Sequence, residues 1–147
     1  MLRVPLQQLD DELPVPHYAR EGDAGADLIA RIDVVLPRRG GRAVVPTGVA
    51  VAIPSGFAGL VLPRSGLAVR HGLTCLNAPG LVDSGYRGEL QVVLVNHDRD
   101  HDYAVSRGDR IAQLVLIRVE HASFELVGEA GLGESQRGGG GFGHTGT

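Results

Sequence analysis

The chain has 147 residues, of which 43% are hydrophobic and 21% charged, and its formal net charge is −3 with histidine neutral. This length and balance predict one globular domain that can bury a core. The negative charge argues against a general nucleic-acid-binding protein, although a few local arginines suffice to bind a small anion.

The sequence also argues against membrane insertion and secretion. No run of about eighteen or more apolar residues is present, so we expect no membrane-spanning segment. The opening residues, MLRVPLQQLDDELPVP, lack the apolar stretch of a signal peptide. The single cysteine, Cys75, has no partner for an internal disulfide, which favours a reducing, cytoplasmic compartment.

Short apolar stretches rich in valine and isoleucine recur along the chain and predict strands. They cover residues 32–36, 49–53, 60–62, 90–95 and 111–119. Turn-forming sequences separate them at residues 37–41, 46–48, 54–56 and 107–109. This spacing predicts an all-β sandwich or barrel. One short helix is expected at Ser65–Arg70, with Gly72 ending it.

Two segments in the first half of the chain contain residues suited to binding. In AGADL, Asp27 stands among small residues at the start of an expected strand, where a plain turn and a solvated carboxylate also explain it. In PRSGLA, Ser65 follows Arg64 at an expected helix N-cap, and Gly66 permits close approach of a ligand. An anion site and an ordinary helix cap explain this second segment equally well.

The segment Gly72–Glu89 is predicted to form a β-hairpin whose arms carry Asn77, Asp83 and Tyr86. Asn77 offers both a donor and an acceptor, which suits one edge of a nucleobase. Asp83 is a candidate general base. The sequence Asp-Ser-Gly is equally typical of a plain turn, so the hairpin alone does not establish a function.

Two later segments remain ambiguous in the same way. Gln113 interrupts an apolar strand and must therefore be hydrogen-bonded, most simply to a structural partner. The glycine-rich end of the chain, from Arg137 onward, cannot pack a core and is expected to be a mobile arm joined by a linker that begins at residue 128. Successive glycine amides with Arg137 can nevertheless form an anion-binding nest.

The polar stretch from Asn96 to Asp102 contains two of the six histidines. His97 and His101 are four residues apart, a spacing that suits a metal site only on a helix. Because the stretch lies between two expected strands, a solvated turn is the better interpretation, and no zinc pattern is present elsewhere in the sequence.

Five segments in series, AGADL, PRSGLA, GLVDSGYRGEL, RGDRIAQLV and RGGGGFGHTG, resemble the five ordered motifs of the trimeric dUTPase family. The resemblance runs from about Gly22 to Gly146. It implies an all-β, jelly-roll-like β-clip subunit with one short helix and a flexible arm. It also implies a homotrimer whose active sites take residues from all three chains, with residues 1–127 as the β-barrel domain and 128–147 as the linker and arm.

The resemblance further implies hydrolysis of dUTP to dUMP and pyrophosphate, which limits uracil incorporation into DNA and supplies dUMP for dTTP synthesis. Asp83 matches the residue that activates water for attack on the α-phosphate. Tyr86 matches the ring beneath the deoxyribose, which leaves no room for a 2′-hydroxyl. Asn77 matches a reader of the uracil edge.

The remaining matched residues concern phosphate, magnesium and the arm. Asp27 matches the acid that holds Mg²⁺ through water, while the ion is held mainly by substrate phosphates. A histidine stands where the family usually has serine or threonine, so the contacts of the arm are left open at that position. The matched phosphate- and arm-contacting positions are Arg64, Ser65, Gly66, Gln113, Arg137, Phe142, Gly143 and His144.

Three alternatives share this scaffold. A dCTP deaminase would need a glutamate placed for proton transfer at the cytosine ring, whereas Tyr86-Arg87-Gly88 follows the dUTPase pattern. A non-catalytic nucleotide sensor could lose its base or its arm, but Asp83 and Arg137 are both present. A purely structural trimer would leave the arm unexplained. We expect no nucleic-acid partner and no membrane partner.

Overall fold

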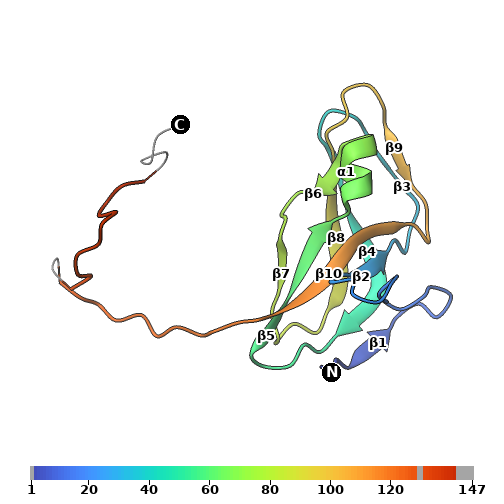
Figure 1. The fold of residues 1–147 in the computed structure, drawn as a ribbon. Helices are drawn as coiled ribbons and strands as arrows, with labels where there is room; N and C mark the ends of the chain where they lie inside the picture. The colour runs from blue at the N-terminus through green and yellow to red at the C-terminus, as the bar shows by residue number, and fades with distance from the viewer. Residues whose placement is uncertain (1, 129–130, 142–147) are drawn as a thin grey trace.

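The computed structural model describes residues 2–128 and 131–141 and consists of short strands with one helix (Figure 1). Two four-stranded antiparallel sheets, in the orders β1-β4-β8-β6 and β2-β10-β5-β7, are accompanied by a two-stranded ladder of β3 and β9. The elements are β1 Leu6–Gln8, β2 Ala26–Ile29, β3 Val34–Leu36, β4 Gly41–Val51, β5 Phe57–Pro63, α1 Ser65–His71, β6 Leu73–Cys75, β7 Gly80–Val82, β8 Glu89–Asn96, β9 Tyr103–Val105 and β10 Arg110–Arg118.

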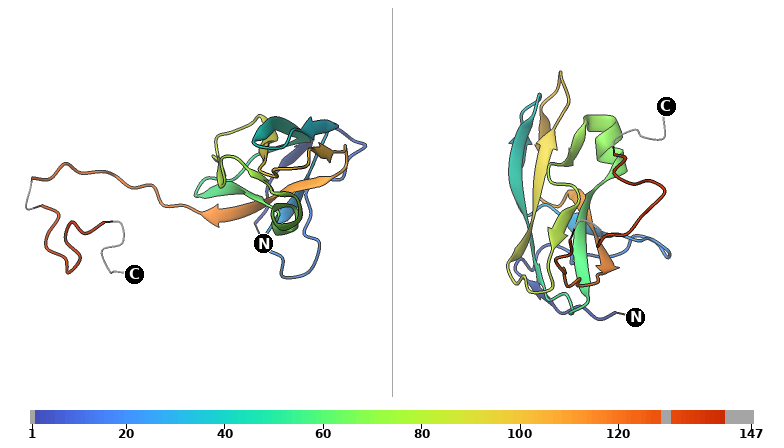
Figure 2. Two further views of the ribbon diagram at one scale, coloured as in Figure 1. Left: turned by 90° about the horizontal axis from the view of Figure 1, so that it is seen from above. Right: turned by 90° about the vertical axis from the view of Figure 1, so that its left-hand side faces the viewer.

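The core lies between the two larger sheets, which form separate layers with β4 and β8 in one and β5 and β10 in the other (Figure 2). Residues of both larger sheets are at most 2% exposed, among them Leu28, Val45, Leu73, Leu90, Leu94 and Ile111, and Leu36 of β3 is buried with them. Burial also raises the pKa of the Cys75 thiol to about 11. The prediction of an all-β sandwich with one short helix is therefore confirmed.

The helix forms where the sequence predicts it, but its N-cap differs. Gly72 ends α1 in the left-handed conformation, with φ of 62°, and its N–H donates to the carbonyl of Ala68. The N-cap residue is Arg64 and makes no side-chain capping bond, so the assignment of Ser65 to the cap is wrong. Ser65 is instead the first residue of the helix.

Two local predictions fail because strands pair with partners distant in sequence. Residues 46–48 do not form a turn: they lie inside β4, where the register with β8 shifts between Pro46 and Ala50 and Gly48 has φ of 75°. The expected hairpin from Gly72 to Glu89 is also absent. β6 pairs with β8 in one sheet whereas β7 pairs with β5 in the other, so the chain crosses between layers there.

After β10 the chain leaves the sheets and runs away from the body as an extended segment (Figures 1 and 2). Phe124 is 97% exposed in this single chain, and Leu126 is fully exposed. Exposed apolar side chains mark an interaction surface when they form a contiguous patch, and Phe124, Leu126 and Val127 are exposed close together in the sequence. In the part of the chain that the structure describes, no helix is both long and apolar enough to cross a membrane.

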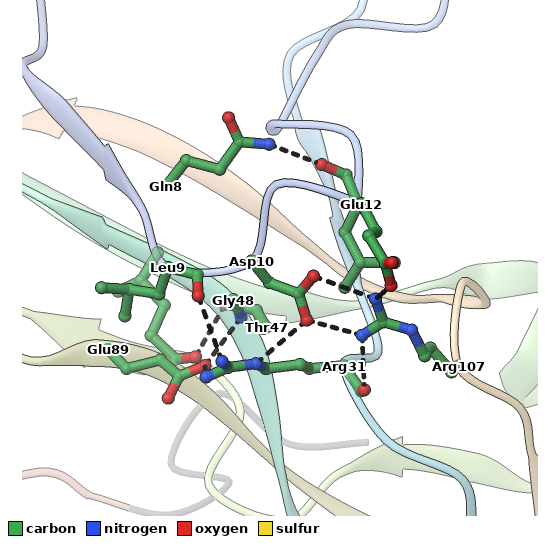
Figure 3. A network of polar contacts seen from close by, with 11 residues as sticks. Gln8, Leu9, Asp10, Glu12, Arg31, Thr47, Gly48, Glu89 and Arg107 are labelled. Atoms are coloured by element: carbon green, nitrogen blue, oxygen red, sulfur yellow. Dashed lines mark hydrogen bonds and ion pairs between the residues drawn. The ribbon is translucent and has the colours of Figure 1, made fainter.

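An ionic network fastens the N-terminal segment to both sheets (Figure 3). Arg107, after β9, donates to both carboxylate oxygens of Asp10 and to Glu12. Arg31, after β2, lies 3.1 Å from Asp10 and 3.4 Å from Glu89, measured between guanidinium nitrogens and carboxylate oxygens. Asp10 thus joins two arginines, and the hydrogen bonds from Arg107 and Arg31 hold the pKa of its carboxyl well below the usual value.

We expect Asp10→Asn to lower the melting temperature at neutral pH, because the substitution removes the negative charge that both arginines contact. A lowered folded-state pKa means that this contribution is complete above the unfolded-state value of about 4 and is lost as pH falls below it. The difference in Tm from wild type should therefore shrink under acid, as measured by calorimetry from about pH 7 to pH 3.

Asp11→Asn is the matched control, because Asp11 is exposed and its side chain makes no hydrogen bond or ion pair within the described residues. Equal Tm values for wild type and Asp10→Asn at neutral pH would contradict the structural role of the network.

Candidate functional site

A cavity of about 640 Å³ opens beside the N-terminal end of α1 and brings together three of the sequence segments. Its volume suits a small-molecule ligand. The predicted residues that line it are Asp27, Arg64, Ser65, Gly66 and Gln113. β-sheet pairing explains the grouping, because β10 lies between β2 and β5 and places residue 113 opposite both Asp27 and Leu62.

Asp27 is the charged centre of this cavity, and its residue is only 8% exposed. One carboxylate oxygen lies 3.3 Å from Nε of Arg64, and the other lies 3.3 Å from Nη1 of Arg110. A buried carboxylate needs such partners, because removing an unpaired charge from water is costly. Arg64 also donates to the carbonyl of Arg110 at 3.1 Å, so both arginines are held beside the cavity.

Gln113 is hydrogen-bonded, as its position in an apolar strand requires. Its Nε2 donates to the carbonyl of Pro63 at 3.2 Å, which ties β10 to the end of β5. Gly25 makes room for the amide, since a Cβ at residue 25 would lie 2.5 Å from Oε1 of Gln113. The absence of a side chain at Gly25, in the first motif, therefore allows Gln113, in the fourth motif, to take this position.

Three arginines that the sequence analysis did not single out also line the cavity: Arg20, Arg70 and Arg110. Arg110 is three residues before Gln113, so strict strand alternation would place the two on opposite faces. The register of β10 with β2 shifts between Arg110 and Ala112, and no pattern in the sequence indicates that shift. Arg70 is four residues after Gly66 on α1, a spacing that places both on one helical face. Arg20 lies in an N-terminal loop, where no pattern in the sequence indicates its position.

Asp83 and Tyr86 lie elsewhere, beyond the end of β7. They line a second hollow, whose other residues are Val44, Leu81, Val82, Leu90, Gln91 and Val93. The Tyr86 hydroxyl donates to the carbonyl of Glu89 at 2.9 Å, which fixes the ring. A Cβ on Gly88 would lie 2.7 Å from Cζ of that ring. Any larger residue at position 88 would therefore displace the ring.

The two groups of residues are at opposite ends of β5. Val82 pairs with Gly59, so Asp83 follows near the start of β5, whereas Arg64 follows its last residue. At about 3.3 Å per residue, the two backbone positions are roughly 20 Å apart. The two hollows share no lining residue.

Asn77 lies in neither hollow. It is exposed in the turn between β6 and β7, and its Nδ2 would be 3.2 Å from a Cβ placed on Gly80. Arg137 lies in a turn near the C-terminus, where its Nε donates to the carbonyl of Gly140 at 2.8 Å. The remaining predicted residues, Phe142, Gly143 and His144, lie outside the described residues.

The polar loop between β8 and β9 has the contacts of a turn. Asp98 Oδ1 accepts the backbone N–H groups of Asp100 and His101 at 2.8 and 2.9 Å, and these bonds lower the pKa of the Asp98 carboxyl. Within residues 2–128 and 131–141, no group of three or more His, Cys, Asp or Glu side chains is placed to hold a metal ion.

Comparisons with a family model and with individual proteins point to the same family. A dUTPase family model matches residues 11–146. A deoxyuridine 5′-triphosphate nucleotidohydrolase of Thermobifida fusca (strain YX) is 57% identical over 145 residues, covering 99% of this chain and 79% of that protein. A protein of the same name from Mycobacterium marinum is 56% identical over 142 residues, covering 95% of this chain and 92% of that protein.

Solved structures agree with the sequence matches. The dUTPase of Staphylococcus bacteriophage 80alpha with dUPNHPP superposes with a TM-score of 0.86 at 28% identity, covering all of both chains. A mutant dUTPase from phage phi11 of S. aureus, described with a structural Mg(II) ion, gives a TM-score of 0.77 at 26% identity and covers 87% of this chain and 98% of that one.

The contact between Gly25 and Gln113 generates a prediction about the cavity wall. We expect Gly25→Ala to lower the free energy of unfolding by about 1–3 kcal/mol, because the new methyl group overlaps the glutamine amide. Truncating the amide in Gly25→Ala/Gln113→Ala should recover part of this loss, measured as a double-mutant cycle in urea.

Gly85→Ala is the control, because a Cβ at residue 85 meets no atom within 4 Å. Additive effects of the substitutions at residues 25 and 113 would show that the two residues do not constrain one another.

Proposed function

The chain belongs to the dUTPase family, and we propose that it hydrolyses dUTP to dUMP and pyrophosphate, using the arginine-lined cavity for the phosphates and Asp83 to activate water. The observation that carries the proposal is the cavity itself, in which arginines surround a single buried carboxylate next to Ser65 and Gly66. Such a reaction would limit uracil incorporation into DNA and supply dUMP for dTTP synthesis.

The cavity supports phosphate binding in three ways. Guanidinium groups bind phosphate oxygens with paired hydrogen bonds, and they stay charged at every relevant pH. Gly66 has no side chain, so a polar group can approach the backbone at the start of α1 closely, as the Arg70 guanidinium does. The Ser65 hydroxyl and the Gln113 amide add neutral donors that can fix the orientation of the phosphate chain.

Asp83 is proposed as the group that orients a water molecule and accepts its proton during in-line attack on the α-phosphorus. The P–O bond to the β-phosphate breaks, and pyrophosphate leaves with the bridging oxygen. Tyr86 is proposed to lie beneath the deoxyribose and to exclude a 2′-hydroxyl by contact. Asn77 is proposed to read the uracil edge, where a fixed pattern of donors and acceptors would reject cytosine.

The cavity residues fit Mg²⁺ held mainly by substrate. Mg²⁺ usually takes one or two protein carboxylates together with phosphate oxygens and water. Asp27 is such a carboxylate, and because Arg64 and Arg110 already contact both of its oxygens, it suits a water-mediated contact with the ion. When bound, Mg²⁺ would neutralise part of the negative charge on the phosphates. Asp27 would orient its water ligands, and the arginines would contact the remaining phosphate oxygens.

We further propose a homotrimer in which each active site combines different chains. The separation of Asp83 from Arg64 along β5 supports this, because the two belong to different hollows of one chain. The exposed Phe124 and Leu126 support it as well, since packing on another copy would cover them. Residues 1–127 would form the barrel domain, and residues 128–147 the linker and arm that close over a neighbouring site. A cytoplasmic location belongs to the same proposal.

Pyrophosphate release from dUTP with Mg²⁺ tests this function. Wild-type protein should act on dUTP with strong preference over dCTP, dTTP and UTP. Asp83→Asn should lower kcat by about 10²-fold or more, because general-base catalysis commonly supplies that much, while binding of a non-hydrolysable dUTP analogue persists. Ser84→Ala, adjacent in sequence, serves as the control.

A folded wild-type protein that binds dUTP without hydrolysing it would favour the nucleotide-sensor alternative. Ammonia release from dCTP would favour the deaminase. Full activity of Asp83→Asn would exclude Asp83 as the base while leaving the reaction itself intact.

The fixed ring of Tyr86 generates a prediction about sugar selectivity. Gly88→Ala should displace the ring, because the methyl group would overlap it, and should raise kcat/KM for UTP relative to dUTP by about tenfold. Steady-state kinetics with both nucleotides measures the ratio. Gly85→Ala should leave the ratio unchanged, and an unchanged ratio in Gly88→Ala would remove Gly88 from the account of selectivity.

A further inference from the structure

The side chain of Arg70 points back along α1 toward the cavity. It lies in the last turn of α1, yet its guanidinium reaches back over the first turn, where Nη2 would be 2.9 Å from a Cβ on Gly66. Helical side chains tilt toward the N-terminus, so a long side chain at residue 70 naturally covers residue 66. As a result, Arg70 lines the cavity together with Arg64, Ser65 and Gln113.

The buried and acidic charges of the cavity already have partners. Asp27 is shared by Arg64 and Arg110 at 3.3 Å each. Asp23 accepts the backbone N–H of Arg20 at 2.8 Å. By contrast, the guanidinium of Arg70 takes part in none of the hydrogen bonds or ion pairs found in residues 2–128 and 131–141.

The cavity therefore has an excess of positive charge. Four arginines (Arg20, Arg64, Arg70 and Arg110) face two aspartates, Asp23 and Asp27, which leaves a net charge of +2 on a chain whose net charge is −3. Like charges gathered at a cavity destabilise the folded protein unless an anion enters.

We propose that Arg70 is a further phosphate-binding residue, which contacts the pyrophosphate portion of the bound nucleoside triphosphate. The inference rests on the proposed function, because it assigns this side chain to the phosphates of the same site. Arg70 is exposed, so its guanidinium can turn toward a ligand without unfolding the helix. Two parallel N–H groups then match two phosphate oxygens, which a single ammonium group cannot do.

Titration calorimetry with the full-length protein tests the proposal. The ligands are dUMP and a non-hydrolysable dUTP analogue with an imido group between the α- and β-phosphates, both with Mg²⁺. Arg70→Gln should weaken binding of the analogue by roughly tenfold to a hundredfold, the usual range for loss of a charged hydrogen bond. Binding of dUMP should change little, and Arg70→Lys should fall between Arg70→Gln and wild type.

Arg99→Gln is the matched control, because it removes one exposed arginine that does not line the cavity. Equal affinity of Arg70→Gln and Arg99→Gln for the analogue would overturn the proposal, as would an equal loss for dUMP and the analogue. A wild-type protein with no activity on dUTP would defeat the proposed function instead, so the two failures can be told apart. Circular dichroism and mass measurement confirm that the variants keep their fold and assembly.

Discussion

The pairing of β5 with strands on both sides is the constraint on which the rest of the site depends. β10 pairs along one edge of β5 and brings Gln113 and Arg110 toward Asp27 and Arg64. β7 pairs along the other edge in a register that places Asp83 near the opposite end. Because strand register is fixed wherever one face of a sheet is buried, neither group can slide toward the other without exposing core residues such as Val61. The chain therefore presents two separate surfaces, one cationic and one carrying the candidate base.

Within the cationic surface, close packing and charge act together. The carboxylate of Asp27 balances the charge of two arginines. The missing side chains of Gly25 and Gly66 leave the space that the Gln113 amide and the Arg70 guanidinium occupy. On the other surface, Tyr86 is held by the carbonyl of Glu89, whose side chain accepts the N–H of Gly48 at 2.7 Å and lies 3.4 Å from Arg31. The ionic network of Figure 3 thus ends at the backbone that fixes the ring. Glycines and structural ion pairs therefore position the groups proposed to bind substrate.

Local signals in the sequence predicted much of the fold. The apolar stretch at 90–95 became β8, and Gly72 ended the helix, because a short valine-rich stretch and a glycine after a helix are signals carried by neighbouring residues alone. The need of Gln113 for a hydrogen bond followed from its apolar surroundings. Pro-Thr-Gly at residues 46–48 is typical of a turn, whereas pairing with β8 makes the segment part of a strand with a register shift. The assignment of β6 and β7 to different sheets and the separation of Asp83 from Arg64 depend on long-range register, which spacing along the chain does not encode.

The central claim is that one active site combines the Arg64 cavity of one chain with Asp83 of another. Co-expressing Asp83→Asn with Arg64→Gln, each inactive alone, tests it most directly. If the two residues act across a subunit boundary, mixed oligomers contain some sites with both wild-type residues, about a quarter of all sites for equal amounts of the two chains. The rate of pyrophosphate release from dUTP should then recover to about a quarter of the wild-type rate. Mixed oligomers that form, as shown by mass, but stay as inactive as the separate variants would mean that both residues serve one chain's own site and would contradict the account.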